Sequence, residues 1–203
     1  MPDSVDLFLD GSALAPTLPG LTRAGWAVVA MRPGTASPLF VCFGHLPGRY
    51  EQAAGGGELF AFMMALRLTA FPGVLYTDFQ HLIDGLERGK IWCTSPERRY
   101  ATSWTLAWAV LDDMVMPEVL KVKAHSAYRA DAPPAARRLR AGNVWADAFA
   151  KAGAAKHPSN AGIVEEHVTR AKIAGMVLRW AGEALAHWPM VDAATRAGDA
   201  EAM

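Results

Sequence analysis

The sequence predicts an α/β fold with a five-stranded mixed sheet, helices flanking that sheet, and one further helix toward the C-terminus. Apolar stretches at 5–9, 24–31 and 39–44 are joined by short links rich in glycine and proline, which is typical of an antiparallel meander. The second half instead alternates helical periods with short apolar strands at 74–78 and 119–124. That alternation is typical of strands added in parallel, with helices lying on the sheet.

The first strand has the pattern of a strand covered on both faces. Val5, Leu7 and Leu9 alternate onto one face, and Phe8 points to the other. We expect the strand to end on Asp10, which is followed at once by a glycine and a serine. Taken alone, that ending is typical of an ordinary turn.

Helical periods follow from the middle of the chain onward. Three glycines at 55–57 break the chain, and Glu58 is expected to open a helix with apolar residues at spacings of three and four. Further helices are predicted at 80–88, stopped by Gly89, and at 103–114. The second of these carries core-forming residues on one face: Trp104, Trp108 and Leu111.

The C-terminal third predicts two more helices. Asn143 is a suitable cap for a helix over 144–155, whose first turn would contain Asp147. A helix over 163–187 carries an apolar stripe that either packs on the domain's own surface or docks a partner. We therefore expect three parts: a domain over 4–155, a helical extension over 156–190 and a flexible tail over 191–203.

Composition excludes several classes of protein. No apolar run approaches the roughly 20 residues of a membrane span, and the first residues lack the pattern of a signal peptide. Cys42 and Cys93 are the two cysteines, too few for a disulfide framework and without zinc-site spacing. These features predict an intracellular protein, nuclear or cytoplasmic, that is neither secreted nor bound to a membrane.

Charge is balanced overall but unevenly distributed. Lysine plus arginine and aspartate plus glutamate each total 20, so the net charge does not indicate a nucleic-acid partner. Between residues 119 and 140, however, a single acid faces six basic residues: Lys121, Lys123, Arg129, Arg137, Arg138 and Arg140. Such a segment either follows a phosphate backbone or is a solvated loop with a basic bias.

Four acids occupy comparable places in the predicted fold. Asp10 and Asp78 each end a strand, Glu58 opens a helix, and Asp147 lies near the start of another. If the first strand lies beside the fourth, Asp10 and Asp78 become neighbours, and the helix starts can bring the other two acids to the same edge.

Carboxylates that converge within a few ångströms repel one another unless cations neutralise them. Oxygen ligands select Mg²⁺ or Mn²⁺, and no His/Cys cluster competes for a softer metal. Two such ions about 4 Å apart are the usual device for hydrolysing a phosphodiester. The four acids therefore predict a hydrolytic metal centre.

The order of these motifs resembles type 1 ribonuclease H over roughly residues 4–155. The matching pieces are Asp-Gly-Ser at 10–12, the helix-opening Glu58, Thr-Asp-x-Gln at 77–80, His125 after a strand, and Gly-Asn-x-x-Ala-Asp-x-x-Ala at 142–150. Lys-Ala-His at 123–125 and Gly-Asn-Val-Trp-Ala-Asp at 142–147 also resemble ribonuclease H domains that accompany the reverse transcriptases of retroelements.

The resemblance implies a role for each matching residue. Asp10, Glu58, Asp78 and Asp147 would hold two Mg²⁺ ions, which Mn²⁺ could replace. His125 would assist proton transfer or product release. The remaining matches would contact the substrate, with Gln80 in the minor groove of the hybrid and Gly11 and Ser12 near an RNA 2′-hydroxyl. From the basic segment we add four candidate substrate contacts: Lys123, Arg137, Arg138 and Arg140.

The implied activity is cleavage of the RNA strand of an RNA–DNA hybrid, in a domain that works alone or beside a reverse transcriptase or polymerase. Phe79 and the glycines before Glu58 depart from the family's usual polar residues. The alternative is a non-catalytic module that binds nucleic acid or docks a polymerase through the helix at 163–187. A proofreading-type exonuclease would require an acid two residues after Asp10, where this chain has Ser12.

Overall fold

The computed structural model describes residues 5–14, 20–68, 73–123, 131–158 and 161–187. The chain divides into two compact units, residues 1–158 and residues 159–203. Among the described residues, no helix is long and apolar enough to cross a membrane.

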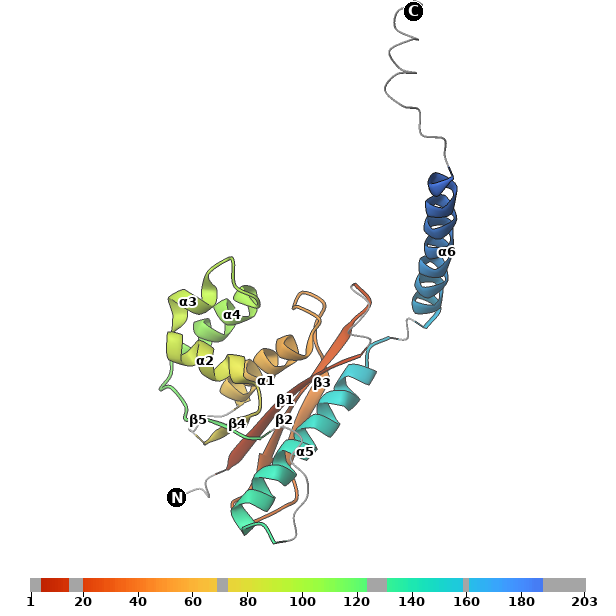
Figure 1. Cartoon of the computed structure of the whole chain (residues 1–203). Coiled ribbons are helices and arrows are strands. Elements are labelled where there is room, and N and C mark those ends of the chain that lie inside the picture. Colours follow the sequence, from red (N-terminus) through yellow and green to blue (C-terminus); the bar gives the residue numbers. More distant parts are fainter. Residues whose placement is uncertain (1–4, 15–19, 69–72, 124–130, 159–160, 188–203) are drawn as a thin grey trace, which may run out of the picture. The chain divides into compact units, whose positions relative to one another are not determined.

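The first unit is built on a five-stranded sheet with strand order β3-β2-β1-β4-β5 (Figure 1). β1 pairs antiparallel with β2 and parallel with β4, while β3 and β5 extend the two sides. The predicted mixed sheet, with the first strand beside the fourth, is therefore confirmed. The strands are β1 (Asp6–Leu14), β2 (Arg23–Met31), β3 (Phe40–His45), β4 (Leu75–Thr77) and β5 (Val119–Lys121).

Helices cover both faces of this sheet. The first unit contains α1 (Ala54–Leu68), α2 (Gln80–Arg88), α3 (Lys90–Thr94), α4 (Ala101–Leu111) and α5 (Pro134–Ala155). Leu7 and Leu9 join a core cluster with residues of α1 and α4, whereas Phe8 joins a second cluster with Ala146 of α5. The alternation read from the first strand is confirmed, because α1 and α5 lie on opposite faces of β1. Trp104 and Trp108 are core residues, as predicted.

The first of these helices begins earlier than predicted. α1 starts at Ala54, so the three glycines form its first turn and Glu58 lies one turn inside. The reason is a close approach between backbones: a Cβ on Gly57 would lie 2.4 Å from the carbonyl oxygen of Gly25, and one on Gly11 would lie 2.2 Å from that of Ala54. Glycine is unfavourable in a helix, but here its missing side chain lets α1 rest directly on β1 and β2.

α5 also begins earlier, at Pro134 instead of after Asn143. Proline suits the first position of a helix, and the alanines and arginines that follow are strong helix formers. Asn143 is therefore a buried residue inside the helix and not its cap. The five-residue α3 was not predicted, because it is too short to show a helical period.

A prediction follows from the contact between β2 and α5. A Cβ on Gly25 would lie 2.0 Å from the backbone nitrogen of Ala154, so Gly25→Ala should reduce the free energy of unfolding by about 1–3 kcal/mol or more. Urea denaturation measures this loss. Gly48 is the matched control, because a Cβ there meets nothing within 4 Å and Gly48→Ala should change stability little. Equal effects of the two substitutions would contradict the close approach.

The second unit contains α6 (Ala161–Ala186), which matches the predicted helix over 163–187. Its apolar residues, among them Ile173, Met176 and Trp180, are largely exposed. Packing of this helix on the domain's own surface stays a prediction, and the tail over 191–203 lies outside the described residues.

Candidate metal centre

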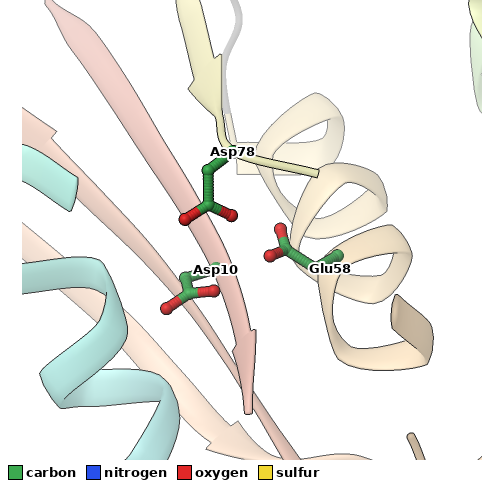
Figure 2. Close-up of side chains that lie close together, drawn as sticks. All are labelled: Asp10, Glu58 and Asp78. Atoms are coloured by element: carbon green, nitrogen blue, oxygen red, sulfur yellow. The ribbon is translucent and has the colours of Figure 1, made fainter. Parts of the chain in front are cut away.

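Three of the four predicted acids lie together. One carboxylate oxygen from each of Asp10, Glu58 and Asp78 lies within 4.8 Å of the others. Figure 2 shows the three side chains converging from β1, α1 and the residue after β4. The sheet edge predicted from strand ends is thus the place where three separate elements meet.

Strand pairing explains why Asp10 lies at the point where β1 and β4 separate. Asp10 does not end its strand as predicted, since β1 continues to Leu14. β4, however, pairs with β1 only as far as Leu9 opposite Thr77. Beyond that pair the two strands no longer bond to each other, and Asp10 and Asp78 are the next residues on each. The site is therefore opened by the end of the shorter strand.

Burial raises the pKa values of the two inner acids. Asp10 is 7% exposed and Glu58 is 4% exposed. The pKa of Asp10 is raised from 3.8 to about 6, chiefly by burial and also by the charge of Asp78, while a hydrogen bond from Glu58 opposes the rise. Burial, followed by the charge of Asp10, raises the pKa of Glu58 well above its usual value. Such a group of carboxyls is stabilised by a cation.

Two neutral side chains orient these acids, and the sequence analysis assigned neither to the site. Thr77 is fully buried, and its hydroxyl donates to Oε2 of Glu58 at 3.3 Å. The side-chain nitrogen of Asn143 donates to Oδ2 of Asp78 at 3.2 Å. The signal was available in the spacing, because Asn143 precedes Asp147 by four residues and so shares its side of α5.

Asp147 lies beside the group of three. It is in the middle of α5, not in the first turn of a helix as predicted, because that helix begins at Pro134. Its charge contributes to the raised pKa of Asp10. Its carboxylate is paired with Lys151, whose Nζ lies 2.8 Å from Oδ2. Three acids therefore lie together, and the carboxylate of the fourth, beside them, is paired with the ammonium group of Lys151.

Four of the predicted substrate contacts lie on β1, on α2 and just after β5. Gly11 and Ser12 continue β1 directly after Asp10, and the backbone of Gly11 donates to Oδ1 of Asp10 at 2.8 Å. Gln80 is exposed at the start of α2, where it donates to Asp84 at 2.7 Å and accepts from Lys121. Lys123 is exposed just after β5. His125 lies outside the described residues, so its role stays a prediction.

The three predicted arginines are not equivalent. Arg137, Arg138 and Arg140 belong to the first turns of α5, and with the turn between β2 and β3 they line an open cavity of about 550 Å³. The guanidinium of Arg138 forms an ion pair with Asp6 at the start of β1, and both side chains are mostly buried. Arg138 therefore joins α5 to the sheet, whereas Arg137 is exposed.

A cluster of aromatic and basic residues follows Asp78. The segment 90–100 shows no clear period in the sequence, but the structure stacks Arg88 and Arg98 on the ring of Trp92, at 4.6 and 4.4 Å from its centroid. Phe79 contacts the ring of Tyr100, with centroids 6.3 Å apart. Guanidinium groups stacked on aromatic rings are suited to contacts with a nucleic-acid strand.

Neither a family model nor a curated protein matches this sequence. Solved structures do. LC9-RNase H1, described as a type 1 RNase H with the type 2 active-site motif, superimposes with a TM-score of 0.57 at 20% identity, over 79% of this chain and 76% of that one. The PFV RNase H domain gives a TM-score of 0.57 at 17% identity, over 74% and 94% of the two chains.

The chain has the ribonuclease H fold. A third ribonuclease H structure, LC11-RNase H1 in complex with an RNA/DNA hybrid, gives a TM-score of 0.51 at 14% identity, over 76% of this chain and 99% of that one. The sheet order and the flanking helices therefore match the fold implied by the resemblance to ribonuclease H. At these identities the likeness concerns the fold.

Proposed function

We propose that this domain is a metal-dependent endonuclease that hydrolyses the RNA strand of RNA–DNA hybrids by a two-ion mechanism. The observation that carries the proposal is the convergence of Asp10, Glu58 and Asp78 within 4.8 Å, on a ribonuclease H fold. LC11-RNase H1, which shares this fold, was solved with an RNA/DNA hybrid.

The donor set fits hard divalent cations. Asp10, Glu58, Asp78 and Asp147 offer only oxygen, which favours Mg²⁺ and, as a substitute, Mn²⁺. Asp10 is the acid best suited to touch two ions, because it is hydrogen-bonded to Glu58 and interacts electrostatically with both Asp78 and Asp147. Ions bound there would activate the attacking water and neutralise charge on the leaving oxygen.

The chain's own residues would hold these acids and the substrate in place. Thr77 and Asn143 orient Glu58 and Asp78 through the hydrogen bonds described above. Gly11 lies where α1 approaches β1, so its backbone and that of Ser12 border the acids on the side where an RNA 2′-hydroxyl would be read. His125 is proposed to move a proton or release product, as the family resemblance implies.

Exposed basic groups occur on two parts of the chain that also supply acids of the site. Arg88 and Arg98 stack on Trp92 in the segment after Asp78, and Arg137 is exposed on α5, the helix that carries Asp147. Contacts to phosphates from both parts would position a duplex across the acids. Work beside a polymerase is part of the proposal, because the protease-reverse transcriptase of Prototype Foamy Virus also matches, with a TM-score of 0.59 at 17% identity, over 79% of this chain and 22% of that one.

The proposal is tested with purified protein and a labelled RNA–DNA hybrid in Mg²⁺ or Mn²⁺. We expect internal cuts in the RNA strand, leaving 3′-hydroxyl and 5′-phosphate ends, and no cutting of duplex DNA. Single-stranded RNA of the same sequence separates hybrid specificity from general ribonuclease activity. If the hybrid stays intact with both metals, the proposal that this domain is a nuclease is refuted.

A second candidate is a non-catalytic module that binds nucleic acid or docks a polymerase. Apolar residues of α6 such as Met176 and Trp180 are not buried within their own unit, which supports a docking role for this helix. Hybrid binding that is indifferent to Mg²⁺, without cleavage, would select this candidate.

Adjacent arginines should separate substrate binding from stability. Arg137→Ala should weaken hybrid binding and lower its salt dependence, because an exposed phosphate contact is lost. Arg138→Ala should instead reduce the free energy of unfolding by about 1–3 kcal/mol, because it leaves the mostly buried Asp6 without its partner. Fluorescence anisotropy and urea denaturation measure the two effects. The reverse assignment would show that Arg138 is the substrate contact.

A further inference from the structure

Lys151 places a positive charge at the margin of the acid cluster. It follows Asp147 by one turn of α5, and its Nζ lies 2.8 Å from Oδ2 of that carboxylate. The ammonium also interacts electrostatically with Asp10. Lys151 therefore neutralises the one predicted ligand that stands outside the group of three.

The contact bears directly on how many ions the site can hold. The oxygen that accepts from Lys151 is one of the two that Asp147 could offer to an ion, and Mg²⁺ and Mn²⁺ would approach it more closely than an ammonium does. Two cations on the same oxygen repel each other, so an ion that takes Oδ2 of Asp147 as its ligand must displace Lys151. The other three acids have no such competitor among the interactions described above.

We propose that Lys151 is a tethered cation that competes with the second metal ion for Asp147. The ion held by Asp10, Glu58 and Asp78 binds first, and the ion that needs Asp147 binds more weakly because Lys151 must leave. The inference rests on the proposed function in one respect: it takes the same acids as ion ligands. Lys151 is thus a positioning residue that sets the metal requirement of the site.

The ordinary role of such a pair is to stabilise a helix. Pairs four residues apart on a helix surface contribute little, and Lys151 and Asp147 are 58% and 27% exposed. A purely structural pair would change the stability of α5 and leave ion binding unaltered. The exposed pair of Lys90 and Asp112, at 52% and 47% exposure, is a matched control remote from the acids in sequence.

The experiment is calorimetric titration of the metal-depleted full chain with MnCl₂ and with MgCl₂. Lys151→Met keeps a helix-favouring side chain of similar length and removes the charge. We expect the weaker of two ions to bind about three- to tenfold more tightly to this variant, a modest gain because the displaced pair is partly solvated. Lys90→Met should bind both ions as the unaltered chain does.

A double-mutant cycle identifies the acid involved. Asp147→Asn should lose or weaken one ion, and adding Lys151→Met to that variant should give no further gain, because the competition takes place at Asp147. A gain of the same size in both backgrounds would show that Lys151 acts by general charge and would overturn the proposal.

These measurements distinguish failure of the proposed competition by Lys151 from failure of the proposed nuclease activity. If the unaltered chain cleaves hybrids and Lys151→Met binds both ions with unchanged affinity, the inference fails and the nuclease stands. If the chain cleaves nothing but Lys151→Met tightens ion binding, the inference stands and the nuclease fails. Absence of any ion binding by the unaltered chain would overturn both.

Discussion

Replacing Asp10 by Asn should abolish cleavage of an RNA–DNA hybrid while the protein stays folded. Asp10 is hydrogen-bonded to Glu58, and its charge interacts with those of Asp78 and Asp147. Replacing it therefore removes the ligand that both proposed ions would share. Bound ions of this kind supply several kcal/mol of transition-state stabilisation, and about 1.36 kcal/mol is a factor of ten in rate. We expect a loss of about a thousandfold or more, measured on a labelled hybrid at saturating Mg²⁺.

The control for this variant is another aspartate of the same unit. Asp113 is exposed just after α4, and Asp113→Asn should cleave at the rate of the unaltered chain. Circular dichroism confirms that both variants are folded. Cleavage by Asp10→Asn within tenfold of the original rate would remove Asp10 from the centre of the mechanism.

Without metal, the stability of the protein should fall as the pH rises from about 4 to about 6. Burial raises the pKa of Asp10 from 3.8 to about 6 in the folded chain. Between these values the folded state binds more protons than the unfolded state, so raising the pH favours unfolding. The loss is complete above the folded value and amounts to something on the order of 3 kcal/mol at 1.36 kcal/mol per pKa unit. The raised pKa of Glu58 acts in the same direction.

Thermal unfolding in a metal chelator at pH 5 and pH 7.5 tests this dependence. Adding Mg²⁺ at pH 7.5 should restore stability, because the ion binds the folded, ionised cluster. Asp10→Asn removes one buried acid, so in chelator at pH 7.5 this variant should melt at a higher temperature than the unaltered chain. Its melting temperature should also fall less between pH 5 and pH 7.5. The raised pKa of Asp10 would be contradicted by one pair of results. The unaltered chain in chelator would be more stable at pH 7.5 than at pH 5, and Asp10→Asn would show the same dependence of stability on pH.

Local pattern was sufficient to predict much of the fold. The alternation around Phe8 determines which side chains face α1 and which face α5, because a strand turns successive residues to opposite faces. The change from a period of two to a period of three and four locates α2, α4 and α6 within a few residues. Gly89 ends α2 with a φ of 81°, a conformation that glycine adopts without strain.

The helix starts that were predicted wrongly, those of α1 and α5, share a physical cause. The glycines before Glu58 are poor helix formers in isolation, and only their contact with the backbones of Gly11 and Gly25 makes the first turn of α1 stable. Asn143 is a good cap by residue type, but a proline and a run of helix formers upstream start α5 ten residues sooner. Both outcomes depend on neighbours that a local period cannot include.

The chemistry of the candidate site can be read from the residues alone, because the four acids occur in the expected order and all offer oxygen donors. How these acids meet depends on the packing of the folded chain. The pairing of β4 with β1 ends just before Asp10. Buried Thr77 and Asn143 donate hydrogen bonds to Glu58 and Asp78, and Lys151 forms an ion pair with Asp147. The physical reason is that ligand types are a property of residues, whereas distances among carboxylates depend on strand register and on how closely two helices approach one sheet.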